Sequence, residues 1–169
     1  MKSDSLFIVM GVSGSGKTTI AQMLARATGG EVLDADDFHT PENKAQMHAG
    51  IPLTDEQRWP WLDRLNTALR AAATKNKPIY LACSALKQSY RDRLVIELPG
   101  ARFIYLKSTF AFIHARLAQR KNHFMPASLL ESQFATLEEP HDAIVLDISR
   151  TASQLLEDFR AAAKVPAQA

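Results

Sequence analysis

A glycine-rich segment early in the chain has the residue types and the spacing of a phosphate-binding loop. It fits the pattern G-x-x-x-x-G-K-[ST] at every fixed position, as Gly11, Val12, Ser13, Gly14, Ser15, Gly16, Lys17 and Thr18. The glycines permit backbone conformations in which successive N–H groups point at phosphate oxygens. We expect Lys17 to reach the β- and γ-phosphates, Thr18 to coordinate Mg²⁺ through its hydroxyl, and Thr19 to complete the ATP-binding set.

An acidic segment follows the apolar pair Val32-Leu33 and contains Asp34, Asp36 and Asp37. Transfer of a phosphoryl group to an alcohol requires a group that orients and deprotonates the attacking hydroxyl, and carboxylates near Mg²⁺. Asp36 is the first candidate for that base. Asp34 is the second and would act through metal-bound water, whereas Asp37 is expected to face solvent.

Two further side chains near this segment suit an acceptor that carries hydroxyl and carboxylate groups. His39 would either hydrogen-bond a polyol or cap the following turn. Arg58 is one of only two bases among residues 31–63, which hold eight acids. It would either bind a substrate carboxylate through two hydrogen bonds or form a salt bridge with Asp55 or another of the surrounding acids. Trp61 is expected to pack in the core.

The elements that must position these residues are short apolar runs that alternate with helical patterns. The expected strands are Leu6–Met10, Val32–Leu33, Ile79–Ala82, Phe103–Leu106 and Ala143–Leu146. This alternation predicts an α/β protein of three layers, with a five-stranded parallel sheet covered on both faces. The phosphate loop and the acidic segment would then meet at the carboxyl edge of the sheet. Pro60 should split its helix into two pieces around Trp59.

Composition limits the remaining possibilities. The 169 residues are 46% hydrophobic and carry a formal net charge of +2, values typical of a globular protein, and this length predicts one domain spanning residues 1–169, which the phosphate loop would make a P-loop kinase domain. A single cysteine, Cys83, excludes an internal disulfide framework and is expected to be buried without acting as a nucleophile. The longest apolar runs are too short for a membrane span, so we expect a cytoplasmic protein without a membrane partner.

Other classes of nucleotide or anion binder fit less well. Residues 64–123 hold twelve bases and two acids, but these bases are spread over several elements without a nucleic-acid recognition motif, so no nucleic-acid partner is expected. A nucleotide switch without turnover would not need the acidic segment, and the chain has no N-K-x-D segment for guanine. Many P-loop proteins carry an acidic residue, the Walker-B carboxylate, at the end of the third strand. Here the third expected strand is followed by Cys83-Ser84, which small metabolite kinases often tolerate.

The chain resembles bacterial gluconate kinase from about Phe7 to Ile148. The resemblance rests on the phosphate loop, Asp34–His39, Gly50–Asp55, Arg58–Leu62, Cys83–Lys87, Tyr90–Asp92, His123–Pro126 and Ser132–Phe134. It implies ATP- and Mg²⁺-dependent phosphorylation of D-gluconate to 6-phospho-D-gluconate, a P-loop fold similar to nucleoside monophosphate and shikimate kinases, and a homodimer. A kinase of the same fold that acts on another sugar acid, shikimate or a nucleoside monophosphate is the alternative.

The same resemblance assigns roles to the basic middle of the chain. It implies that Ser84, Lys87 and Arg91 face the acceptor, and that a lid lies at about residues 119–128. Arg116 would then stack on adenine and His123 would form a hydrogen bond in the lid. Arg120 would meet the β,γ-phosphates and join Lys17 and Asp36 as the catalytic residues.

One position departs from the family pattern. Ala35 stands between the two loop aspartates where the family usually has glycine. A positive φ at Ala35 would shift the loop and weaken the role expected of Asp36.

Overall fold

The computed structural model describes residues 5–120 and 127–164 and contains one parallel sheet. The five strands are β1 (Leu6–Met10), β2 (Glu31–Asp34), β3 (Ile79–Ala82), β4 (Ala101–Lys107) and β5 (Ile144–Asp147). Their order across the sheet is β2-β3-β1-β4-β5, and every neighbouring pair is parallel. The predicted five-stranded parallel sheet is therefore confirmed.

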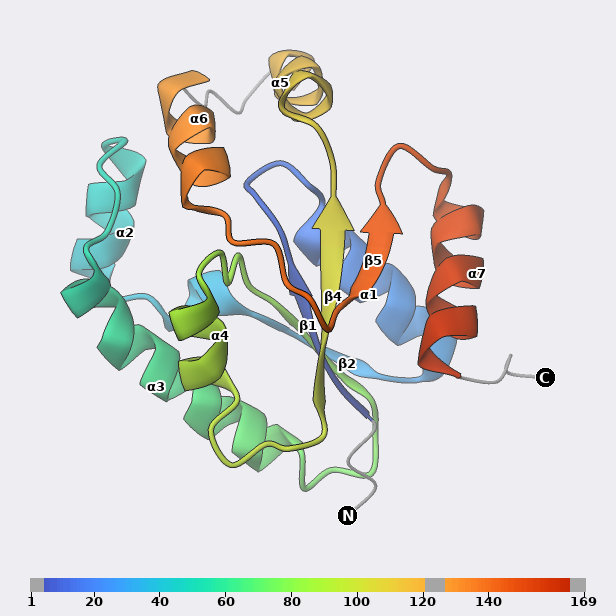
Figure 1. Cartoon of the computed structure of the whole chain (residues 1–169). Helices are drawn as coiled ribbons and strands as arrows, with labels where there is room; N and C mark the ends of the chain where they lie inside the picture. The colour runs from blue at the N-terminus through green and yellow to red at the C-terminus, as the bar shows by residue number, and fades with distance from the viewer. Residues whose placement is uncertain (1–4, 121–126, 165–169) are drawn as a thin grey trace.

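Helices cover both faces of this sheet, as Figure 1 shows. They are α1 (Lys17–Thr28), α2 (Pro41–His48), α3 (Asp55–Ala72), α4 (Gln88–Leu94), α5 (Phe110–Ala118), α6 (Ala127–Thr136) and α7 (Ala152–Ala163), with a 3₁₀ helix η2 at Ala35–Phe38. Helices α1 and α7 pack on one face, and α3 and α4 on the other. The three-layer α/β architecture predicted from the alternation is confirmed.

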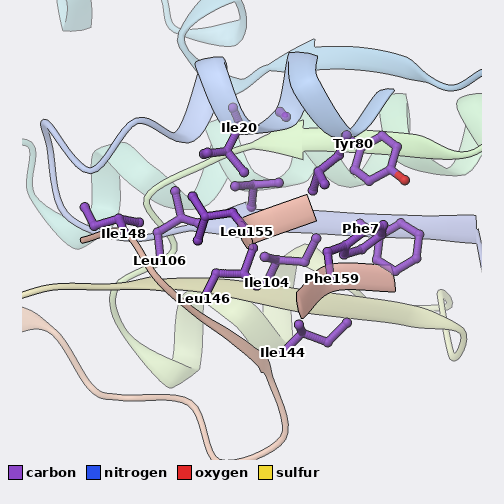
Figure 2. Packing of buried hydrophobic residues seen from close by; sticks show 14 of the residues in the cluster. Phe7, Ile20, Tyr80, Ile104, Leu106, Ile144, Leu146, Ile148, Leu155 and Phe159 are labelled. Carbon is purple, nitrogen blue, oxygen red and sulfur yellow. The ribbon is translucent and has the colours of Figure 1, made fainter. Parts of the chain in front are cut away.

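Central strand β1 is buried along its whole length because it lies between β3 and β4. Its alternate side chains enter two separate cores: Phe7 and Val9 face α1 and α7, whereas Ile8 faces α3. Figure 2 shows the first core, where the Phe7 ring stacks on Tyr80 at 5.2 Å and meets the edge of Phe159 at 5.3 Å. This packing gives the phosphate loop that follows β1 a rigid base.

Helix α3 runs unbroken through Pro60, so the prediction of two pieces around Trp59 is wrong. Pro60 is exposed near the start of the helix, where its ring removes one backbone hydrogen bond. The Thr54–Gln57 capping box holds the first turn. Trp61 then buries its ring in the core beyond the proline, and these contacts outweigh the lost bond.

Helices α2, α5 and α6 lie beyond the sheet edge to which the arrows of β4 and β5 point in Figure 1. The ends of β1, β2 and β3 open at this same carboxyl edge because all five strands are parallel. Within residues 5–120 and 127–164, no helix is long and apolar enough to cross a membrane.

Candidate active site

A cavity of about 420 Å³ opens at the carboxyl edge of the sheet. Several separate parts of the chain form its wall: the phosphate loop with the start of α1, the end of β2 with η2, the α2–α3 connection with the first turns of α3, the end of β3, the segment after α5, and α6. Residues of these parts that line the cavity include Ser13, Gly14, Gly16, Lys17, Thr18, Thr19, Asp34, Asp36, His39, Arg58, Ser84, Arg120 and Gln133. One space therefore joins the predicted nucleotide residues to the predicted acceptor residues.

The phosphate loop connects β1 to α1 in the strand–loop–helix order that the motif requires. Gly14 has φ 80° and Gly16 has φ 90°, conformations that side chains disfavour. A Cβ atom at Gly14 would lie 2.9 Å from Leu117 Cδ2, and one at Gly16 would lie 3.6 Å from Arg116 Nη2. Helix α5 therefore packs against the loop, and glycine is required where it does so.

Lys17 begins α1 and turns its ammonium group back across the loop, where Nζ donates a hydrogen bond to the Val12 carbonyl at 3.1 Å. Burial lowers the pKa of Lys17, while the negative charges of Asp36 and Asp34 act in the opposite direction. Lys17 thus lies between the loop and the acidic segment. Gly11, Val12 and Ser15 belong to the same loop but are not among the residues that line the cavity.

Thr18 and Asp34 bring two hard oxygen ligands together at the end of β2. The Thr18 hydroxyl donates to Asp34 Oδ2 at 2.8 Å, while Asp34 Oδ1 accepts from the Asp36 N–H at 3.0 Å. Mg²⁺ commonly binds to one or two protein oxygens and completes its shell with water and phosphate. The pair fits such an ion, and the described residues contain no group of three or more acidic, histidine or cysteine side chains suited to a metal.

Asp36 lies in η2 and lines the cavity, and its backbone N–H bonds to the Asp34 oxygen that Thr18 does not contact. Desolvation by the surrounding protein, followed by the negative charge of Asp34, raises the pKa of the Asp36 carboxyl group. A raised pKa makes a carboxylate a stronger base. Ala35, which precedes Asp36, does not have a positive φ, so alanine fits the backbone conformation at this position without strain. The alanine therefore does not displace Asp36.

His39 is held flat against Trp61, with the two ring centroids 4.2 Å apart. Its side chain lines the cavity, and Nδ1 is buried with no hydrogen-bond partner among the described residues. Burial, together with the charges of Arg58, Arg64 and Lys44, lowers the pKa of His39 to about 4. The imidazole is therefore neutral at physiological pH, and its ring nitrogens can donate a hydrogen bond to a hydroxyl group or accept one from it.

Arg58 projects from α3 into the cavity wall and is held from behind. Its Nη1 donates to the Leu53 carbonyl at 2.7 Å and to Tyr90 Oη at 3.3 Å, and its guanidinium lies 5.4 Å from the centre of the Tyr90 ring. Asp55 forms its ion pair with Lys87 instead, at 3.1 Å. Among the described ion pairs, none links Arg58 to an acid, so the alternative of an Arg58–Asp55 pair is not observed.

The three residues assigned after β3 are not brought together. Ser84 lines the cavity, whereas Lys87 lies outside it, paired with Asp55. Arg91 is 2% exposed and donates to the carbonyls of Ala85 at 2.8 Å and Glu138 at 2.9 Å. Because these acceptors occupy the guanidinium, the structure places Arg91 beneath the site as a support and not at its surface.

The remaining predicted residues fall into three groups. Arg120 lines the cavity, and Arg116 faces the phosphate loop at Gly16. His123 and most of the predicted lid lie outside the described residues. Cys83 is 1% exposed, as expected, and burial raises its pKa to about 12, which leaves the thiol protonated and poorly nucleophilic.

Sequence reasoning missed two residues of this site. Gln133 on α6 accepts a hydrogen bond from the Ser13 N–H of the phosphate loop at 2.6 Å and lines the cavity. Tyr90 donates a hydrogen bond to Asp55 and holds Arg58. Both lay in segments that carry the family resemblance, but neither residue type has a local pattern that indicates its role.

Comparisons with known proteins show which families the chain is similar to. A family model described as an AAA domain matches residues 6–140. Thermosensitive gluconokinase of Escherichia coli (strain K12) is 42% identical over 160 residues, which cover 92% of this chain and 86% of the relative.

Two solved structures are similar over nearly the whole chain. A sugar kinase from Janibacter sp. HTCC2649, in an unliganded structure, has a TM-score of 0.84 and 50% identity, covering 92% of this chain and 91% of that chain. A gluconokinase from Sinorhizobium meliloti 1021 has a TM-score of 0.85 and 36% identity, covering 97% and 94%.

Proposed function

The chain belongs to the gluconokinase family, and from that membership and its site we propose that it transfers the γ-phosphoryl group of ATP to D-gluconate. The products are ADP and 6-phospho-D-gluconate. The observation that carries the proposal is the single cavity that joins the phosphate loop to Asp36, His39 and Arg58. Both reactants must share one space for direct transfer.

In the proposed step, Asp36 accepts the proton of the terminal hydroxyl of gluconate. The hydroxyl oxygen forms a bond to the γ-phosphorus, and the bond from that phosphorus to the β,γ-bridging oxygen breaks, so that ADP leaves with the bonding electrons. Lys17 and Arg120 face the negative charge that spreads over the phosphoryl oxygens during transfer. The raised pKa of Asp36 supports its role as the base.

Recognition of gluconate is proposed for three side chains of the cavity wall. Arg58 presents a guanidinium suited to the carboxylate, since its position is fixed by Leu53 and Tyr90. His39 and Ser84 supply neutral hydrogen-bonding groups for the hydroxyls. Burial, followed by the guanidinium charge of Arg58, lowers the pKa of His39 and so keeps the imidazole neutral.

Mg²⁺ is proposed as the metal that accompanies ATP. Thr18 and Asp34 would hold it, since their oxygens already lie together at the end of β2. When bound, Mg²⁺ neutralises charge on the β- and γ-phosphates.

We further propose that the protein is a cytoplasmic homodimer. The dimer rests on the family resemblance, and the cytoplasmic location rests on the requirement for ATP as a substrate. Light scattering of the purified protein tests the dimer, and a monomer at micromolar concentration would contradict it.

Formation of ADP by the purified protein, supplied with Mg-ATP and one acceptor at a time, tests the function. The acceptors are D-gluconate, other aldonic acids, shikimate and AMP. We expect ADP release that depends on gluconate and little release with the others. Turnover on a different acceptor alone would keep the kinase chemistry and overturn the substrate, whereas silence with every acceptor would overturn the proposed function.

A further inference from the structure

A side chain from late in the sequence reaches the phosphate loop. The Ser13 N–H donates a hydrogen bond of 2.6 Å to Gln133 Oε1, across 120 positions of the chain. Both residues line the cavity that also contains Asp36. Helix α6 therefore places an amide group at the point where the phosphate loop meets the acceptor side.

This contact fixes the orientation of the Gln133 amide. A primary amide has one acceptor oxygen and two N–H donors, and a backbone N–H can bond only to the oxygen. The oxygen of Gln133 must therefore be the atom that faces Ser13. Within residues 5–120 and 127–164, no hydrogen bond from Gln133 Nε2 is formed, so its two donors remain available to a ligand.

The neighbours of Gln133 indicate which ligand oxygen these donors would meet. Ser13 belongs to the loop that surrounds phosphate, and Lys17, Arg120 and Asp36 line the same space. The terminal phosphate of ATP is the part of the nucleotide that must lie between the loop and Asp36. Its oxygens accept hydrogen bonds and carry negative charge, so N–H donors bind them strongly.

We propose that Gln133 is a further catalytic residue: its Nε2 donates hydrogen bonds to the γ-phosphoryl group in transit, while Ser13 holds its oxygen in place. This inference rests on the proposed function. Charge spreads over the phosphoryl oxygens during transfer, and donors that are already oriented stabilise it without reorganisation. The amide is neutral, so it adds donors without adding to the charge of Lys17 and Arg120.

Two substitutions distinguish the role of the Nε2 donors from that of the Oε1 acceptor of Gln133. Gln133→Ala removes both contacts, and we expect kcat to fall about 100-fold while the KM values for ATP and gluconate stay within about threefold. Gln133→Glu keeps an acceptor for Ser13 but replaces the donors with a second carboxylate oxygen. We expect it to be at least as slow as Gln133→Ala, because it repels the phosphoryl group.

The matched control is Glu131→Ala, an exposed residue two positions earlier on the same helix, which should leave kcat unchanged. A Gln133→Ala enzyme with kcat within about threefold of wild type would overturn the proposal, as would a fully active Gln133→Glu enzyme.

A measurement without an acceptor tests the contact directly. With Mg²⁺ and the non-hydrolysable analogue β,γ-imido-ATP, the ³¹P resonance of the bound γ-phosphorus should differ between wild type and Gln133→Ala, while the α-phosphorus resonance stays in place. Identical γ-phosphorus resonances would overturn the proposal. Because gluconate is absent, this result is independent of the acceptor, whereas failure of the wild-type protein to phosphorylate gluconate would count against the proposed function.

Discussion

The hydroxyl of Thr18 donates a hydrogen bond of 2.8 Å to the carboxylate of Asp34, although the two residues belong to different elements of the fold. Thr18 lies in the first turn of α1, and Asp34 is the last residue of β2. Two strands of one parallel sheet thus deliver a hydroxyl and a carboxylate to the same point. This arrangement makes the proposed use of Mg²⁺ testable through a residue outside the phosphate loop.

Replacing Asp34 with asparagine should weaken the use of Mg²⁺ by the enzyme. Asparagine can still accept the Asp36 N–H, so the start of η2 is preserved, but the negative charge near the ion is lost. We expect the Mg²⁺ concentration for half-maximal activity to rise about tenfold or more. Titration of activity with MgCl₂ at saturating ATP measures this, with Asp37→Asn at pH 8 as the control. An unchanged midpoint would remove Asp34 from the metal site.

Substitution of Asp36 should affect turnover far more than nucleotide binding. In Asp36→Asn the proton acceptor is lost while the shape of the side chain is kept, so we expect kcat to fall about 10²- to 10⁴-fold. ATP affinity, measured by calorimetry, should stay within about threefold. Asp37→Asn, its exposed neighbour, provides the comparison. Near-normal turnover of Asp36→Asn would exclude the carboxylate as the base.

The pH dependence of kcat/KM should show an acidic limb set by Asp36. Only the deprotonated carboxylate accepts a proton, so activity falls as pH drops through its pKa, which desolvation and the charge of Asp34 hold above the ordinary value for an aspartate. The charge of Asp37 also raises this pKa. Asp37→Asn should therefore move the acidic limb to lower pH. Profiles of kcat/KM from pH 4 to 9 for the wild type and the variant measure this shift. A limb that stays in place or moves upward contradicts this assignment.

Arg58 should determine the apparent affinity for the acid group of the acceptor. Arg58→Lys keeps the charge but loses the planar pair of donors, so we expect KM for gluconate to rise about tenfold or more, with little change in KM for ATP. Arg70→Lys is a suitable control, because Arg70 lies exposed on the same helix and pairs with Glu97. Equal rises in both KM values would point to a general disturbance of the site instead.

Arg91 should contribute to folding and not to gluconate binding. Lysine cannot reach all the carbonyls that Arg91 now satisfies, so Arg91→Lys should lower the free energy of unfolding by about 2–4 kcal/mol. Arg93→Lys, which alters an exposed pair with Asp63, should cost less than about 1 kcal/mol. Urea unfolding measures both, and KM for gluconate at 15 °C should stay unchanged. A raised KM for gluconate without a loss of stability would instead show that Arg91 contributes to gluconate binding.

Local patterns were sufficient for much of the fold. The strands Leu6–Met10 and Ile79–Ala82 have the predicted bounds, because each is an apolar run whose ends are marked by polar or glycine-rich segments. The loop between β1 and α1 and the acidic segment after β2 follow from the same signals. Parallel pairing predicts that these segments meet at one edge of the sheet, and in the structure Lys17 and Asp36 line one cavity there.

Contacts between distant segments could not be predicted in this way. The family resemblance implies that Lys87 and Arg91 both face the acceptor, but α4 begins at Gln88, with Lys87 at its N-cap and Arg91 buried within the helix. The partners that decide this are Asp55 and Glu138, which lie 32 positions before Lys87 and 47 positions after Arg91. The contact of Gln133 with Ser13 spans a still longer separation and has no local signal.

The stacked pair of His39 and Trp61 has an optical consequence. The chain has two tryptophans: Trp61 lines the cavity, and Trp59 meets the edge of the Tyr90 ring that holds Arg58. A ligand that displaces His39 changes the surroundings of the Trp61 indole, and one that moves Arg58 disturbs the Tyr90 ring against which Trp59 packs. The intrinsic fluorescence of the unlabelled protein therefore reports occupation of the acceptor side, independently of whether phosphate is transferred.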